Sequence, residues 1–265
     1  MGDPVRWGEM VETAHAPLLT ETELPAAEVL NPQASGDLVL VCEHASATIP
    51  AELGTLGLPE RALAGHWAWD IGALDVARAM AVRLNAPLVV SRVSRLVYDC
   101  NRPPDSPTAI VEVAEHDPVT GNRGLSEAAR RQRVEDVYHP FRDLLAETLE
   151  TRAPRALVNV HSFTPIYFGT PRVVELGFLH DDDAALAEAM LRLAEADPRW
   201  VSRLNEPYDA SDGVTHTLRT QAIPRGITNA MIEIRSDLID TRPAAQGMAA
   251  YLSDILRRAL AEVSG

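Results

Sequence analysis

The sequence predicts an α/β protein, a three-layer sandwich in which helices cover both faces of a mixed, mainly parallel central sheet. Three short apolar runs, at residues 38–42, 156–160 and 230–234, have the Val, Ile and Leu content of strands that are buried on both faces. Segments with helical spacing of apolar residues alternate with such runs, as in parallel sheets. Residues with polar or ionisable side chains lie in or just after each run, where ligands bind in these folds.

The first half of the chain is expected to contain an irregular segment, three strands and one helix. Residues 1–36 are rich in Pro, Glu and Thr without periodicity, so we expect an irregular N-terminal segment there. The strands, all short apolar runs near turn-forming residues, should cover 38–42, 87–91 and 95–100. Apolar residues recur with helical spacing over 72–84, and Asn85 is expected to end that helix.

The second half is expected to begin with a loop over 106–124, whose length is uncommon unless the loop is functional. The longest helical pattern follows at 125–152, with Ser126 as its N-cap and a kink or interruption at Pro140. The remaining strands should cover 156–160, 172–179 and 231–234, and the remaining helices 182–196, capped by Asp182, and 243–263. With no repeat or linker, residues 37–265 are expected to form one α/β domain; a split near 105–125 is the competing boundary.

Composition excludes several classes of function. The net charge of −14 repels nucleic acid and anionic membranes, and no stretch approaches the roughly 20 apolar residues of a membrane span. All 24 basic residues are arginine, which rules out a P-loop lysine or a Schiff-base lysine. The start of the sequence resembles no secretory signal, so we expect a cytoplasmic location. Cys42 and Cys100 lie in apolar runs and are expected to be free thiols.

Two histidines suggest a site for one divalent metal ion, with zinc as the expected metal. His44 and His161 both follow apolar runs, and neutral imidazole is a common zinc ligand. A catalytic zinc usually has three protein ligands, so a carboxylate should complete the set. Asp70 is the preferred candidate, although it could instead cap the following helix. Glu43 is the alternative if the strand has already ended before His44.

A glutamate and two arginines complete the candidate site. Glu233 lies within an apolar run, where a carboxylate is costly unless it is paired or functional, so it is a candidate general base. The alternative is a buried ion pair with Arg235. Arg102, held by the proline pair that follows it, is suited to bind a substrate carboxylate, and Arg95 could supply a second cation. Structural salt bridges are the alternative for both arginines.

Several of these segments, taken in order, resemble zinc carboxypeptidase-like hydrolases. The matching features are a histidine at a strand end, then Asp-x-Asn-Arg at 99–102, His-Ser-Phe at 161–163 and Ile-Glu-Ile-Arg at 232–235. Together with Cys-Glu-His-Ala at 42–45, Asp-Ile-Gly-Ala at 70–73, Ser-Arg-Leu-Val at 94–97 and Tyr-His-Pro at 138–140, they look more closely like the N-formylglutamate amidohydrolase family. The similarity covers about residues 37–260.

The resemblance implies a carboxypeptidase/phosphorylase-hydrolase-like fold and a metal-dependent amidohydrolase that cleaves an N-acyl acidic amino acid such as N-formylglutamate. It assigns His44 and His161 as metal ligands, Glu233 as the catalytic base, and Asn101 with Arg102 as binders of the substrate carboxylate. Carboxypeptidases place a ligating glutamate where this chain has Ala47, so the third ligand stays open between the two carboxylates named above.

Three further points stay open at this stage. His139 and His216 match the family less securely, so no role is assigned to them. The substrate could be another N-acyl amino acid or a small peptide. Alternatively, the protein could be a non-catalytic binding protein that retains the fold. The expected partner in every case is a small-molecule carboxylate, without nucleic acid or membrane.

Overall fold

A seven-stranded mixed sheet forms the middle layer of the protein in the computed structural model, which describes residues 17–263. From edge to edge, the strands are β1 (Ala27–Leu30), β3 (Leu88–Ser91), β2 (Leu38–Cys42), β6 (Ala156–Phe163), β11 (Thr228–Arg235), β9 (Leu176–Leu179) and β10 (Ser202–Leu204). The four strands from β3 to β11 are parallel, whereas β1, β9 and β10 run in the opposite direction. The predicted mixed, mainly parallel sheet is confirmed.

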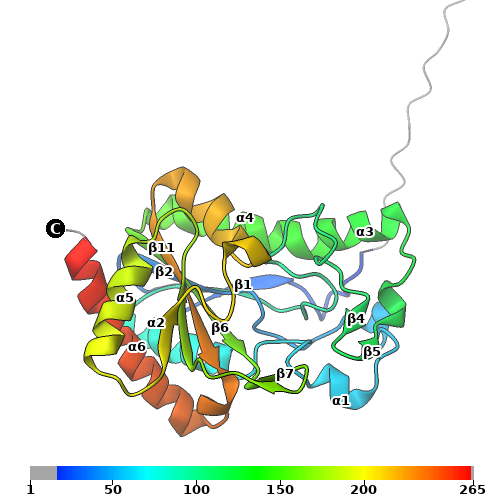
Figure 1. Cartoon of the computed structure of the whole chain (residues 1–265). Helices are drawn as coiled ribbons and strands as arrows, with labels where there is room; N and C mark the ends of the chain where they lie inside the picture. The colour runs from blue at the N-terminus through cyan, green and yellow to red at the C-terminus, as the bar shows by residue number, and fades with distance from the viewer. Residues whose placement is uncertain (1–16, 264–265) are drawn as a thin grey trace, which may run out of the picture.

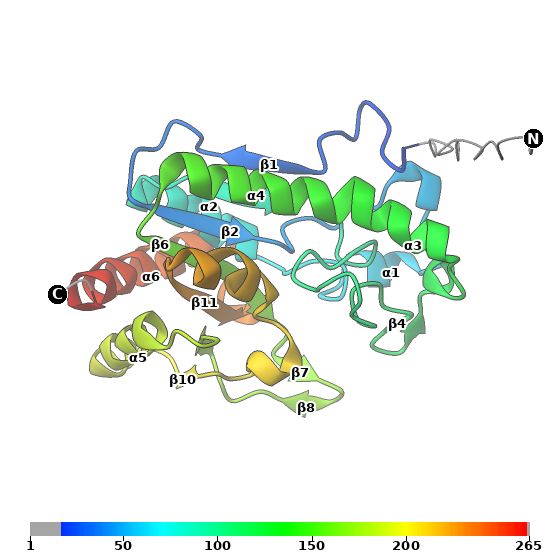
Figure 2. The same cartoon turned by 90° about the horizontal axis from the view of Figure 1, so that it is seen from above.

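Helices cover both faces of this sheet (Figure 1). The helices α2 (Ala73–Leu84), α5 (Ala185–Ala196) and α6 (Arg242–Val263) pack together on one face. On the other face, α3 (Glu127–Arg133) and α4 (His139–Arg152) form one nearly continuous rod in Figure 2, joined by a π-helical turn at Val134–Tyr138. The strands from β3 to β9 in the sheet order are buried on both faces, so the Val- and Leu-rich runs of the sequence fill the two apolar cores.

Because β2, β6 and β11 are parallel, the three apolar runs end on the same side of the sheet, which we call its carboxyl edge. β11 pairs in register with β6, so that Glu233 lies opposite His161. His44 follows the neighbouring strand β2 by two residues. Because carboxyl ends of parallel strands share an edge, residues that are far apart in the sequence become neighbours there.

The predicted helices are largely confirmed, with boundaries set by local chemistry. Asn85 ends α2 in a left-handed conformation, and the hydroxyl of Ser126 accepts a hydrogen bond from Ala129 N at the start of α3. Pro140 lies in the first turn of α4, directly after the π-helical turn that interrupts the predicted long helix. Asp182 does not cap α5; the carboxylate of Asp183 accepts the hydrogen bond from Ala185 N.

The strand predicted at 95–100 is wrong. Its apolar residues are buried, but the backbone turns, with Val97 N donating to Ser94 O and Arg102 N to Asp99 O. The buried Arg133 of α3 holds this turn in place, donating to Val97 O at 3.0 Å and to Asn122 Oδ1 at 2.6 Å. Burial lowers the pKa of Arg133 to about 10. The apolar pattern thus reports a buried turn, because burial alone does not distinguish a turn from a strand.

Other elements differ from the sequence-based expectation at the sheet edges and in the loops. The segment at 17–36, expected to be irregular, contributes the edge strand β1; residues 1–16 lie outside the described part of the chain. The strand predicted at 172–179 starts only at Leu176. Five strands were not predicted, because each is only two or three residues long: β10 and the strands of the hairpins β4–β5 (Val113–Ala114, Asp117–Pro118) and β7–β8 (Ile166–Tyr167, Thr170–Pro171).

Two further expectations concern the cysteines and the possibility of a membrane-spanning helix. Cys42 and Cys100 are both buried free thiols, as expected. Within residues 17–263, none of the helices has the length and apolar content needed to cross a membrane.

Candidate metal and catalytic site

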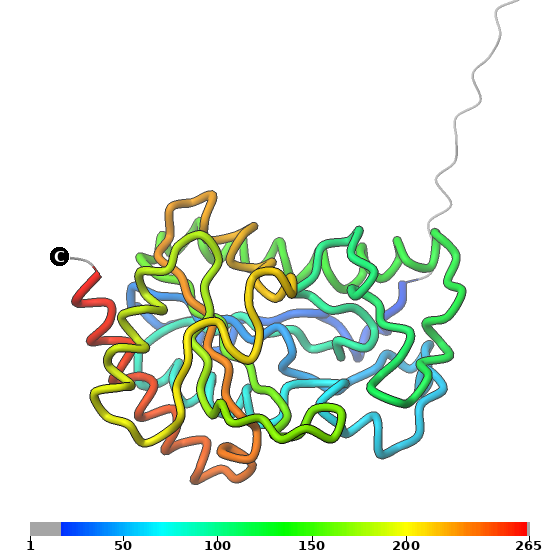
Figure 3. The backbone as a smooth tube through the Cα atoms, in the orientation of Figure 1, coloured from blue at the N-terminus to red at the C-terminus, as the bar shows by residue number. Residues whose placement is uncertain are grey.

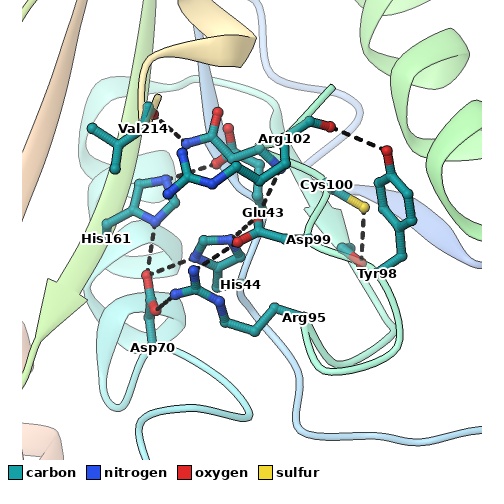
Figure 4. Close-up of polar contacts among 12 residues, drawn as sticks. Glu43, His44, Asp70, Arg95, Tyr98, Asp99, Cys100, Arg102, His161 and Val214 are labelled. Carbon is teal, nitrogen blue, oxygen red and sulfur yellow. Dashed lines mark hydrogen bonds and ion pairs between the residues drawn. The ribbon is translucent and has the colours of Figure 1, made fainter. Parts of the chain in front are cut away.

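The rings of His44 and His161 face a common carboxylate at the carboxyl edge of the sheet. Their ring centres are 4.8 Å apart. Asp70, in the loop before α2, places Oδ2 at 2.7 Å from Nδ1 of His161 and at 3.2 Å from Nδ1 of His44. All three side chains are buried, and one ligand atom from each lies within 4.8 Å of the others (Figure 4). The structure thus brings together the three residues predicted as metal ligands.

The other ring nitrogen of each histidine lies close to a second carboxylate. Nε2 of His44 lies 2.7 Å from Oδ1 of Asp99, and Nε2 of His161 lies 3.0 Å from Oε2 of Glu43. Asn159 of β6 donates a hydrogen bond to Oε1 of Glu43 at 2.5 Å and fixes that carboxylate. Such outer partners select the tautomer and orientation of metal-binding histidines. Glu43, the alternative third ligand, therefore lies at the ring nitrogen that faces away from Asp70.

The electrostatics of this cluster favour a positive charge between the rings. Burial opposes the charged form of His161, but Glu43 and Asp70 outweigh it and raise the pKa of His161 well above its ordinary value. Burial and Arg95 lower the pKa of His44, whereas the neighbouring carboxylates raise it, and the net shift is upward. A cluster that draws protons onto two imidazoles also attracts a divalent cation.

Glu233 lies beside the cluster on β11. Its register partner on one side is His161 and on the other is Gly177 of β9, which has no side chain to cover it. Glu233 is 5% exposed, and its Oε2 has no hydrogen-bond partner among the described residues. Burial, opposed by the charge of His161, raises the pKa of Glu233 to about 7. A carboxyl group with such a pKa can accept and return a proton near neutral pH.

The alternative ion pair between Glu233 and Arg235 is not formed. Arg235 instead donates to Asp237 at 2.8 Å and to Glu175 at 3.1 Å, and it does not line the cavity of the site. A carboxylate inside a strand without a cation partner is a candidate functional group, because burial without pairing is costly.

Arg102 and Asn101 both border the cavity but differ in how their side chains are bonded. No described carboxylate forms an ion pair with Arg102, and its buried Nε and Nη1 lack hydrogen-bond partners among the described residues. The Asn101 amide, in contrast, donates to the carbonyl of Val214 and accepts a hydrogen bond from Thr217 N at 3.0 Å. Arg102 therefore has free capacity for a substrate anion, whereas Asn101 anchors the segment at 214–217.

Arg95 is largely committed to the carboxylates around the histidines. Its guanidinium lies 2.6 Å from Oδ2 of Asp99 and 3.5 Å from Oδ1 of Asp70, although the residue also borders the cavity. Burial lowers the pKa of Arg95, but Asp99 and Asp70 outweigh this effect and raise it. The structural salt bridge given as the alternative to substrate binding by Arg95 is thus present, and it orients two carboxylates that contact His44.

A cavity of about 320 Å³ opens above these residues. Four aromatic side chains contribute to the rest of its wall: Phe163, from the His-Ser-Phe motif, and Trp67, Tyr167 and Tyr208, which the sequence did not single out. Figure 3 shows how the β7–β8 hairpin, which carries Tyr167, extends beyond the sheet edge. At its tip, the ring of Phe168 meets that of His116 at 5.4 Å, which joins this hairpin to the β4–β5 hairpin. Single aromatic residues at strand ends and in loops give no periodic signal, so the sequence could not reveal this part of the wall.

The two histidines left without a role lie outside this cavity. His216 Nε2 lies 2.8 Å from the hydroxyl of Tyr138, and His139 packs on the same tyrosine with ring centres 5.8 Å apart. The sequence analysis assigns no role to two other residues of the site. Asp99 enters it only as part of a motif, and Asn159 only as part of an apolar run. A polar residue inside an apolar run was the available signal for Asn159, because such a group needs a buried partner.

Comparisons with known proteins find similar sequences and similar folds. A sequence model of the family described as N-formylglutamate amidohydrolase matches residues 36–240. The solved structure of a gene product from Agrobacterium tumefaciens is 47% identical, with a TM-score of 0.91 over 94% of this chain and 100% of its own. An N-formylglutamate amidohydrolase from Ralstonia eutropha, 19% identical, has a TM-score of 0.69 over 89% of this chain and 97% of its own, and shares the fold. No curated protein matches the chain significantly.

Proposed function

The chain belongs to the N-formylglutamate amidohydrolase family and is an amidohydrolase; from this premise we propose that it uses a divalent metal, zinc by preference, to cleave the amide of an N-acyl acidic amino acid such as N-formylglutamate. In that reaction the amide C–N bond breaks, a C–O bond to water forms, and the products are formate and the free amino acid. The observation that carries the proposal is the convergence of two imidazole Nδ1 atoms on one Asp70 oxygen beside Glu233.

The residues present fit a metal ion. Two imidazole nitrogens and a carboxylate are a common ligand set for catalytic zinc, and His44, His161 and Asp70 would hold the ion. Asp99 and Glu43 would orient the two rings from outside, as the outer partners of metal-binding histidines do. Such an ion supplies Lewis-acid polarisation of a carbonyl and lowers the pKa of a water molecule.

The other residues of the site would bind the substrate and move a proton. Glu233, with its raised pKa, would accept the proton of the attacking water and deliver it to the leaving amine nitrogen. Arg102 would hold a substrate carboxylate with its unpaired guanidinium nitrogens. Arg95 would keep Asp99 and Asp70 in position through its two ion pairs. Asn101 would support Arg102 indirectly by fixing the segment at 214–217.

A panel of amides tests this proposal with the metal-loaded protein. We expect the highest kcat/KM for N-formyl-L-glutamate, a lower value for N-acetyl-L-glutamate, and the lowest for glycyl-L-glutamate, with formate release measured directly for the first. Faster cleavage of the acetyl compound or the dipeptide would move the proposal to that substrate class. Failure to hydrolyse any of the three, together with no bound divalent metal and none taken up, would favour a non-catalytic binding protein.

A further inference from the structure

Arg172 is a second arginine without a carboxylate partner at the edge of the cavity. It follows the β7–β8 hairpin, and its guanidinium carbon lies 4.5 Å from the ring centre of Tyr167, 4.9 Å from that of Tyr208 and 5.4 Å from that of Phe163. Its Nη1 donates a hydrogen bond to the hydroxyl of Tyr208 at 2.9 Å. Among residues 17–263, no Asp or Glu forms an ion pair with Arg172, so none of its five N–H donors meets a carboxylate in that part of the chain.

The position of Arg172 is defined by the residues around it. All three rings that enclose its guanidinium also line the cavity. The ring of Trp67, which also lines the cavity, lies 6.4 Å from that of Tyr167. Burial is the main cause that lowers the pKa of the cavity residue His66, and the positive charge of Arg172 contributes to the same shift. The charge of Arg172 therefore lies next to the part of the cavity wall that Tyr167, Tyr208 and Phe163 form.

The aromatic enclosure prepares Arg172 to bind an anion. Ring faces attract a guanidinium through cation–π interactions and restrict its orientation without neutralising its charge. A planar guanidinium held in one orientation loses little further entropy when it binds a carboxylate through two parallel hydrogen bonds. Arg95 differs from Arg172, because Asp99 and Asp70 already neutralise its charge.

Two arginines at this site thus lack a carboxylate partner among the described residues: Arg102, which lines the cavity, and Arg172, which packs against rings that line it. We propose that Arg172 binds the second carboxylate of an N-acyl dicarboxylic amino acid, while Arg102 binds the first, so that Arg172 sets the preference for an acidic side chain. This inference rests on the proposed function, since it concerns the substrate of the same site. A substrate with one carboxylate would leave Arg172 without an anion.

The test compares N-formyl-L-glutamate with N-formyl-L-glutamine, which has almost the same shape but lacks the second charge. We expect the wild-type protein to favour the glutamate compound by roughly 10–100-fold in kcat/KM, the range that charge-assisted hydrogen bonds provide. Arg172→Gln should raise KM for the glutamate compound by a similar factor and change kcat/KM for the glutamine compound less than about threefold. Arg172→Lys, which keeps the charge but not the fork, should recover part of the preference.

Two further measurements make the outcome decisive. Arg192→Gln removes a surface arginine that pairs with Glu262 away from the cavity and should leave both substrates unaffected. Equal losses for both substrates in Arg172→Gln, or no glutamate preference in the wild type, would overturn the role of Arg172. If the wild type hydrolyses neither compound, the proposed function fails; calorimetric binding of the same two compounds then tests Arg172, and equal affinities in wild type and variant would overturn it.

Discussion

Replacing Glu233 with glutamine should leave metal binding intact and lower turnover by about 10²–10⁴-fold, the usual contribution of a general acid–base group. Glutamine has nearly the same volume but cannot accept and return a proton. The substitution breaks no hydrogen bond of Oε2, because that atom has no partner among the described residues. Steady-state rates of formate release and the metal content of the purified variant are the two measurements that check this expectation.

A matched substitution separates the chemistry from general effects of removing a charge. Glu188, an exposed residue of α5, can be changed to glutamine in the same way, and this variant should keep wild-type turnover. A Glu233→Gln protein that retains most of its activity would remove Glu233 from the proton transfer. Loss of metal in that variant would instead place Glu233 among the metal ligands.

The second large effect concerns the choice between Asp70 and Glu43 as the third metal ligand. Asp70→Asn should reduce metal affinity by more than 100-fold, because it would remove a direct ligand. Glu43→Gln should reduce affinity by only about 10–100-fold, which is typical of an outer partner of a ligating histidine. Glutamine is still a poor replacement at this position. Its side-chain NH₂ group would face either the donor Nδ2 of Asn159 or Nε2 of His161, where Glu43 has a carboxylate oxygen.

Competition with a chromogenic zinc chelator measures both affinities under the same conditions. Glu175→Gln provides a control, since Glu175 pairs with Arg235 outside the cavity and should not affect metal affinity. A larger loss in Glu43→Gln than in Asp70→Asn would reverse the assignment and make Glu43 the direct ligand.

The central strands and the metal cluster could be predicted because their signals are local. A buried parallel strand requires a continuous apolar run, and the ends of β2 and β6 place His44 and His161 at one edge of the sheet whatever the loops do. Asp70 could be named as a candidate only, because a residue before a helix can equally be a cap. The geometry separates the two carboxylates by showing which ring nitrogen each one contacts.

The substrate-facing parts of the site could not be predicted in the same way. The apolar residues around Val97 predict a strand, although they form a turn, because a buried turn and a buried strand have similar composition. The prediction therefore missed that Asp99 reaches back to His44. Arg172 falls within a predicted strand. The sequence does not show that three rings surround its guanidinium or that no described carboxylate pairs with it. Such long-range contacts depend on loop paths, which leave no periodic pattern in a sequence.

The most direct test of the metal site is a crystal structure of the zinc-loaded protein with anomalous data collected on both sides of the zinc edge. We expect a single strong anomalous peak in contact with Nδ1 of His44, Nδ1 of His161 and the carboxylate of Asp70. A peak bonded to Glu43 and Nε2 of His161, or no peak at this cluster in crystals saturated with zinc, would contradict it.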